Sequence, residues 1–154
     1  MHLILWRHAE AEDIAPNDLS RALTPRGQRQ AAKMAAWLHA QLGDSIKDWR
    51  LIASPAVRAQ QTASALDLTV ETVNAIAPDA EPNAILAAAQ WPDGTRDVIV
   101  TGHQPTLGRV AALLLHGAEG DVSVKKGAMW WFETREREGR REVRLKAMVV
   151  PEHV

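Results

Sequence analysis

Cysteine is absent from this 154-residue sequence, and no apolar run approaches the length of a membrane-spanning helix. Without cysteine the chain forms no disulfides and has no thiol nucleophile or thiolate metal ligand. A transmembrane helix needs roughly 20 consecutive apolar residues, which exceeds every apolar stretch here. The chain also begins without the basic region and long apolar core of a signal peptide. We therefore expect a cytoplasmic protein that does not bind membranes.

The sequence also lacks a strong excess of charge of either sign. Its formal net charge is −1, with 46% hydrophobic and 24% charged residues, an ordinary balance for a globular protein. Such a chain has none of the basic character of a general nucleic-acid binder, so we expect no nucleic-acid partner. The length predicts a single domain over residues 1–154.

Short apolar runs alternate with helical patterns along most of the chain. This alternation predicts an α/β fold of three layers, with a mostly parallel central sheet flanked by helices. Towards the C-terminus, two alternating segments around Glu138-Gly139 predict a hairpin at the edge of the sheet. The expected strands cover residues 3–6, 49–53, 69–73, 97–101, 128–134 and 143–150, and the expected helices cover 25–42, 55–66, 82–90 and 105–116.

Capping signals mark several of these helices. Thr24 followed by Pro25 is typical of an N-cap and first helical residue, and Ser54-Pro55 repeats the same signal. Gly43 and Gly117 stand where the helices should end. Helices that begin after Ser54-Pro55 and at Pro105 would direct free backbone N–H groups towards the ends of the preceding strands.

Three apolar runs lead directly into residues that can do chemistry. The first ends at Arg7-His8, the second is followed by Arg58, and the third runs into His103. In an open α/β sheet, ligands bind just beyond the carboxyl ends of the strands. If the three strands are parallel neighbours, two arginines and two histidines converge at one edge of the sheet.

These segments resemble the motifs of the histidine phosphatase superfamily, whose fold is that of phosphoglycerate mutase. Alanine replaces glycine in the first motif, and we expect an ordinary backbone conformation at that position. The short chain resembles the small, SixA-like branch of the superfamily, without the inserted cap of larger members. The matching segments, in order from residue 3 to about 115, are Arg7-His8-Ala9-Glu10, Leu23-Thr24-Pro25-Arg26-Gly27-Gln28, Ser54-Pro55 with Arg58 and Gln61-Thr62, and Gly102-His103.

The resemblance implies a catalytic set of Arg7, His8, Arg58 and His103. His8 would attack phosphorus and form a phosphohistidine intermediate, which requires a neutral imidazole. The two arginines match the geometry of phosphate and would disfavour a further positive charge on His8. His103 would donate to the phosphoryl oxygens.

Further substrate contacts are expected at the rim of this site. The resemblance implies a contribution from the backbone N–H of Gln104, and Arg21 is a second candidate for binding substrate. Asp79 and Glu81 are candidates for a general acid, although capping of the helix that begins at Pro82 is the favoured explanation of both.

A metal site built on His8 and His103 is the competing interpretation. These histidines lack close ligand spacing, and neighbouring arginines would repel a cation, so we expect neither a metal nor a cofactor. The remaining histidines carry no motif, and Lys125-Lys126 with residues 135–141 read as solvated charges, or as a contact for an acidic partner.

The sequence thus predicts a phosphatase acting on phosphohistidine in a protein. Two alternatives stay open, namely a phosphatase of small phosphate esters or anhydrides, and a phosphate-binding adaptor without turnover.

Overall fold

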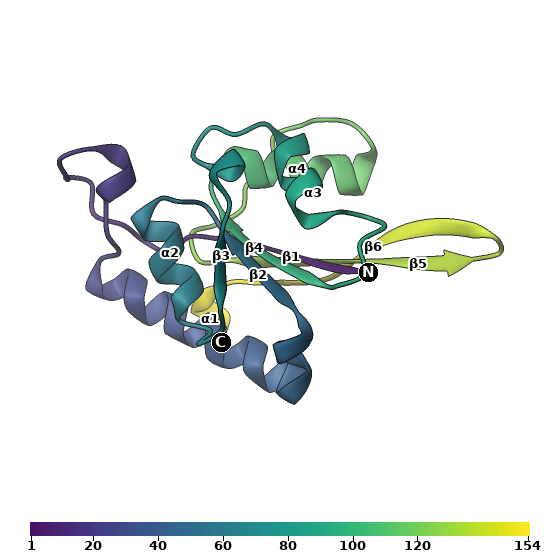
Figure 1. The fold of residues 1–154 in the computed structure, drawn as a ribbon, viewed down its shortest axis with the longest axis horizontal. Helices are drawn as coiled ribbons and strands as arrows, with labels where there is room; N and C mark the ends of the chain where they lie inside the picture. Colours follow the sequence, from purple (N-terminus) through teal and green to yellow (C-terminus); the bar gives the residue numbers. More distant parts are fainter.

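The computed structural model describes residues 1–154, and its six strands form one sheet in the order β3-β2-β4-β1-β5-β6 (Figure 1). The first four strands in this order are parallel, β5 is antiparallel to β1, and β6 is antiparallel to β5. The predicted mostly parallel sheet is therefore confirmed, with the closing hairpin at one edge. The strands are β1 (His2–Arg7), β2 (Arg50–Ala53), β3 (Val70–Thr72), β4 (Val98–Gly102), β5 (Met129–Arg137) and β6 (Arg140–Val149).

Helices cover both faces of the sheet and complete the three layers (Figure 1). Along β1, Ile4 and Trp6 pack on the face covered by α1 and α2, whereas Leu3 and Leu5 pack on the face covered by α3 and α4. Because both faces are covered, β1 is apolar throughout rather than alternating. The helices are α1 (Pro25–Leu42), α2 (Val57–Ser64), α3 (Pro82–Ala89) and α4 (Thr106–His116).

Short 3₁₀ turns connect several of these elements. They are η1 (Asp18–Ser20), η2 (Gly43–Asp48), η3 (Asn74–Ile76) and η4 (Pro151–His153). None of the helices has the length and apolarity that crossing a bilayer would take.

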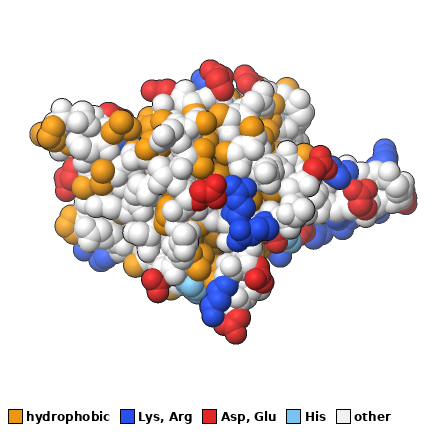
Figure 2. Space-filling view, viewed as in Figure 1, with side chains coloured by type: hydrophobic (Ala, Val, Ile, Leu, Met, Phe, Trp, Pro, Cys, Tyr) orange, Lys and Arg blue, Asp and Glu red, His pale blue; other side chains and the backbone are white.

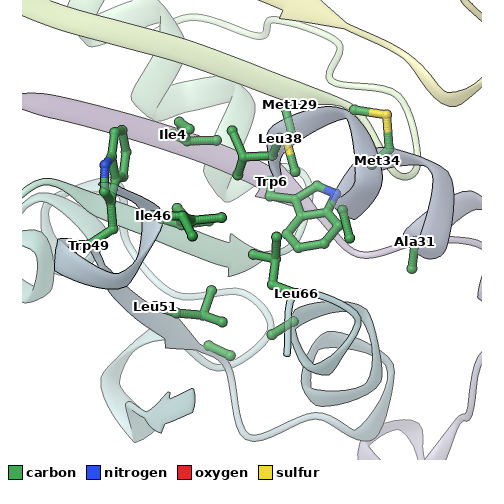
Figure 3. Packing of buried hydrophobic residues seen from close by; sticks show 14 of the residues in the cluster. Ile4, Trp6, Ala31, Met34, Leu38, Ile46, Trp49, Leu51, Leu66 and Met129 are labelled. Atoms are coloured by element: carbon green, nitrogen blue, oxygen red, sulfur yellow. The ribbon is translucent and has the colours of Figure 1, made fainter. Parts of the chain in front are cut away.

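The larger core surrounds Trp6, which is fully buried between the sheet and α1 (Figure 3). Its indole N–H donates to the carbonyl of Gly127 at 3.1 Å, so the one polar atom of the side chain is satisfied. This bond ties the end of β1 to the loop that precedes β5. That loop also reaches the end of β1 where Arg7 and His8 lie, because the Gly127 N–H donates to both carbonyls at 3.1 Å.

The predicted start and end of α1 are confirmed. Thr24 accepts from the Gly27 N–H through its side chain at 2.9 Å, Pro25 is the first helical residue, and Gly43 ends the helix with φ of 55°. A Cβ at Gly27 would lie 1.9 Å from the carbonyl oxygen of Glu10, so only glycine allows the helix to pack this closely on the loop after β1.

The predicted cap at Ser54-Pro55 is wrong. Helix α2 begins at Val57 with Ala56 as N-cap, and it ends at Ser64 rather than near residue 66. The Ser54 hydroxyl accepts from the Ala56 N–H at 3.2 Å, one turn before the helix, and it also contacts His103 at 2.7 Å. The Ser54 side chain therefore stabilises the turn that leads into α2 and contacts the loop after β4, instead of capping the helix.

The segment between β2 and β4 holds only α2, β3, η3 and α3, so the chain has no inserted cap domain. The β5–β6 hairpin is longer than predicted and extends away from the body of the molecule (Figures 1 and 2). Exposed ion pairs such as Arg135–Glu142 and Arg141–Glu136 connect its strands, which fits the solvated charges expected there.

Candidate active site

The motif residues meet in a cavity of about 350 Å³ at the carboxyl ends of three adjacent parallel strands. Arg7 at the end of β1 pairs with Gly102 of β4, and Ala53 of β2 pairs with Thr101 of β4. Only one of the lining residues is hydrophobic, so the cavity suits a charged ligand. It is lined by Arg7, His8, Ala11, Asp13, Asp18, Arg21, Arg58, Pro78, Asp79, His103, Gln104 and Lys126.

His8 is buried, with 6% of its surface exposed, and its ring is held by the backbone. Nδ1 lies 2.8 Å from the carbonyl oxygen of Ala9. Because a carbonyl only accepts, Nδ1 carries the proton, and the lone pair of the neutral ring is on Nε2. The neutral form therefore presents Nε2 as a nucleophile.

The pKa of His8 is lowered to about 4, chiefly by burial, with smaller contributions from Arg58 and Arg7. The hydrogen bond to Ala9 opposes this shift. We expected the arginines to keep His8 neutral, but burial proves the larger cause. The imidazole is neutral at pH 7 in either case, as nucleophilic attack requires.

Arg7 is fixed by a backbone carbonyl of the loop that leads to β5. Its Nη1 donates to Val124 at 2.8 Å, in the segment that leads to β5. The Nε of the same guanidinium is buried and has no hydrogen-bond partner in the protein. A buried donor without a partner is costly, so the geometry favours an anionic ligand that would accept from it.

Arg58, on the first turn of α2, is held by Asp18, which also lines the cavity. Its Nη1 donates to the Asp18 carbonyl at 2.8 Å and its Nη2 to the Asp18 carboxylate at 3.1 Å. The Nε is again buried without a partner. Arg21 approaches the other carboxylate oxygen of Asp18, at 3.2 Å.

Asp18 is the main residue of this site that sequence reasoning missed. Slight burial raises the pKa of Asp18. The hydrogen bond and charge of Arg58, together with the charge of Arg21, lower it by more, so the net shift is downward. The carboxylate is thus ionised at neutral pH and orients both guanidiniums. The only local signal was the turn around Asn17, whose side chain caps η1, and it predicts a loop geometry rather than a role.

His103, which follows β4, lies beside His8 with ring centroids 5.2 Å apart. Its Nε2 lies 2.7 Å from the Ser54 hydroxyl, and its Nδ1 is buried without a partner. Burial, followed by the neighbouring His8 and Arg58, lowers the pKa of His103 to about 3, although Asp18 opposes the shift. His103 is therefore neutral at pH 7 and can donate from only one ring nitrogen.

Gln104 lines the cavity, but its side chain serves the structure. Nε2 donates to the Val122 carbonyl at 2.9 Å, and Oε1 accepts from the Gly108 N–H at 2.7 Å. The Leu107 N–H donates to the His103 carbonyl at 2.9 Å. We expected the start of α4 to offer free backbone N–H groups. This expectation is wrong for Leu107 and Gly108, because the His103 carbonyl and the Gln104 side chain accept from them.

The two general-acid candidates are separated by the structure. Asp79 lines the cavity in a turn with φ of 68°, whereas Glu81 does not line it. Glu81 occupies the N-cap position of α3 but makes no capping hydrogen bond through its side chain. Of the two, only Asp79 lies where it could reach a substrate.

Lys126 was expected among the solvated charges but lines the cavity. It lies in the loop before β5, the same loop whose Val124 carbonyl holds Arg7. No cluster of three histidine, cysteine, aspartate or glutamate side chains has the geometry to hold a metal ion. Four cationic side chains face three carboxylates around two neutral histidines, an arrangement suited to a phosphate group rather than to a cation.

The profile of the histidine phosphatase superfamily (branch 1) matches residues 3–80. A phosphohistidine phosphatase SixA homolog of Haemophilus influenzae is 30% identical over 135 residues, covering 80% of this chain and 82% of that protein.

Solved structures resemble the whole chain. The protein histidine phosphatase SixA in complex with tungstate superposes with a TM-score of 0.80 at 24% identity, over 99% of both chains. A mutant phosphoserine phosphatase of Entamoeba histolytica with bound phosphoserine gives a TM-score of 0.70 at 15% identity, over 99% of this chain and 98% of the other. At these identities the structures establish the fold alone.

Proposed function

The chain belongs to the histidine phosphatase superfamily, and we propose that it hydrolyses phosphohistidine in a protein through a phosphorylated His8. The orientation of the His8 ring carries this proposal. The Ala9 carbonyl holds the proton on Nδ1, at 2.8 Å, so Nε2 presents its lone pair beside two guanidiniums whose Nε groups have no partner. A positioned nucleophile next to unsatisfied anion donors is what phosphoryl transfer requires.

In the first step, the phosphoryl oxygens accept hydrogen bonds from Arg7, Arg58 and His103. Nε2 of His8 attacks phosphorus, so an N–P bond forms while the bond to the leaving group breaks. The leaving imidazole of the substrate, already protonated on its other ring nitrogen, departs with the bonding electron pair as a neutral ring and needs no further proton. Because Nδ1 keeps its proton and its bond to Ala9, the phosphorylated ring carries a positive charge that makes it a good leaving group in the next step.

In the second step, water attacks phosphorus on the side opposite to Nε2. The N–P bond breaks, its electron pair returns to Nε2 and the neutral imidazole is regenerated. The proton lost by the water passes to the product phosphate or to solvent. The arginines act in both steps by stabilising charge on the phosphoryl oxygens, which is the main demand of phosphoryl transfer.

The open, polar cavity supports a protein as substrate. No inserted domain walls it, and a single hydrophobic residue lines it, so it offers little apolar surface to hold a small organic molecule. A phosphorylated side chain on another protein needs only the phosphoryl group and its ring inside the site, since contacts outside the cavity supply the remaining affinity. The H. influenzae relative is named a phosphohistidine phosphatase homolog, which agrees with this choice.

Asp79 favours a second candidate, hydrolysis of small phosphate monoesters. The alcohol of a phosphoserine or sugar phosphate leaves as an alkoxide and needs a proton in the transition state, whereas phosphohistidine that is protonated on its second ring nitrogen releases neutral imidazole. Asp79 lines the cavity and could supply that proton. The two candidate functions are therefore separated by whether Asp79 acts as a general acid.

A substrate panel with two variants tests the proposal. We expect a far higher kcat/KM for a phosphohistidine protein than for phosphoserine or sugar phosphates. Asp79→Asn should change the phosphohistidine rate less than about threefold, and Glu81→Gln, in the same turn but outside the cavity, is the matched control. A loss of about a hundredfold or more in Asp79→Asn, the range of a lost acid–base group, would instead identify Asp79 as the acid of a monoesterase.

Three further measurements test the remaining parts of the proposal. We propose that no metal takes part, so EDTA should leave turnover unchanged, whereas loss with EDTA and rescue by zinc would contradict this. A purely phosphate-binding adaptor would bind phosphate without turning over any substrate, including a reactive aryl phosphate. A cytoplasmic location is part of the proposal and would be checked by cell fractionation.

A further inference from the structure

The contact between Ser54 and His103 joins two buried polar side chains that lie 49 residues apart in sequence. Ser54 is fully buried and His103 is 4% exposed. Their hydroxyl oxygen and Nε2 lie 2.7 Å apart, the distance of a good hydrogen bond. The other ring nitrogen, Nδ1, is buried and has no partner in the protein. His103 itself lines the cavity.

The direction of this bond follows from counting donors and acceptors. The Ser54 hydroxyl oxygen already accepts from the Ala56 N–H at 3.2 Å, and its own hydrogen has no acceptor in the protein other than Nε2 of His103. If Nε2 carried the ring proton, the hydroxyl hydrogen would be buried without an acceptor, which is costly. If the hydroxyl donates to Nε2, the hydroxyl and Nε2 are both satisfied, and the Nδ1–H is the one group of the pair left without a partner in the protein.

We propose that Ser54 is a positioning residue that holds neutral His103 in the Nδ1–H tautomer, so that this N–H is available to the phosphoryl oxygens. This inference rests on the proposed phosphatase function and adds the residue that defines how His103 acts. The opposite tautomer would place a lone pair on Nδ1, the ring nitrogen that has no partner in the protein, and this lone pair would repel those of a phosphoryl oxygen. The effect of Ser54 is therefore to convert a neutral imidazole into a fixed donor.

The arrangement mirrors that of His8. There, a carbonyl that can only accept puts the proton on Nδ1 and leaves Nε2 as the nucleophile. At His103, a hydroxyl that donates occupies Nε2 and leaves Nδ1 as the donor. The two histidines are neutral and 5.2 Å apart, yet their neighbours assign them opposite tasks, one as nucleophile and one as hydrogen-bond donor.

The first test measures the tautomer directly in the wild-type protein. The ¹⁵N chemical shifts of the His103 ring nitrogens, assigned with a His103→Gln variant, should show the proton on Nδ1 at pH 7. Addition of inorganic phosphate should then shift the Nδ1–H resonance. A proton on Nε2 in the wild-type protein would overturn the proposal, whatever the activity of any variant.

The second test removes the hydroxyl. Ser54→Ala should populate both tautomers of His103 and lower kcat for an aryl phosphate by about 10- to 100-fold, somewhat less than the loss of a whole oxyanion donor. Thr101→Val is the matched control, because Thr101 is also fully buried, on β4, but its hydroxyl has no partner. The control should keep the Nδ1–H tautomer and the wild-type kcat.

The outcomes separate this inference from the proposed function. A wild-type protein without turnover would refute the phosphatase proposal, while the tautomer measurement would still stand or fall by itself. A Ser54→Ala variant with an unchanged His103 tautomer, or with wild-type kcat, would show that Ser54 does not position the ring. An equal loss in Thr101→Val would point to packing rather than to the hydroxyl.

Discussion

Acidification should inactivate the protein through His8 with a midpoint near pH 4, well below the value of 6.5 for an unperturbed histidine. Burial lowers the pKa of His8 to about 4, and nearby arginines add to the shift. A difference of about 2.5 units corresponds to about 3 kcal/mol by which the folded protein disfavours the protonated ring. Because only the neutral ring can attack phosphorus, the free-enzyme profile of kcat/KM should be flat down to about pH 5.

The same shift makes folding depend on pH in a defined direction. Since the folded pKa of His8 is depressed, the unfolded chain takes up the proton first, near pH 6.5. The stability linked to this group is therefore fully present above pH 6.5 and is lost as the pH falls through 4. His103, whose pKa is lowered to about 3, adds to the loss over a window that extends further into acid.

Two measurements check this prediction. An NMR titration of the His8 ring gives its pKa directly, with the signal assigned by a His8→Gln variant. The kcat/KM profile must be corrected for ionisation of the substrate, which a ³¹P titration of the substrate alone supplies. A midpoint near 6.5 in both experiments would refute the reasoning, because it would mean that burial in the cavity does not desolvate the ring.

Two further predictions follow from the contacts of the site. His8→Ala should lower turnover by more than about a thousandfold, because His8 alone forms the covalent bond, while vanadate still binds in a calorimetric titration; near-normal activity would end the mechanism. Gly108→Ala should destabilise the protein by about 1–3 kcal/mol in thermal unfolding, since its Cβ would lie 1.9 Å from the Val122 carbonyl and 2.9 Å from the Gln104 side chain. Gly120→Ala, whose nearest neighbour would be at 3.5 Å, is the control, and an equal effect there would contradict the steric argument.

The sequence by itself determined the local elements and the place of the site. Thr24-Pro25 and Gly43 predicted the limits of α1 because capping depends on residues within one turn. The positions of Arg7, His8 and His103 were predictable because parallel strands end at a common edge, so residues that follow two such strands must meet. These inferences need only the chain direction and the periodicity of each segment.

Only the tertiary structure decided how these side chains are held. Asp18 pairs with Arg58 across 40 residues, and the Val124 carbonyl holds Arg7 across 117 residues. No local pattern encodes such contacts, since they depend on which loop packs over which strand end. Ser54 shows the difference most clearly, because the sequence predicts a helix cap whereas the fold brings its hydroxyl to a histidine. The pKa of His8 is likewise a property of the fold, because burial, its main cause, exists only once the layers have packed.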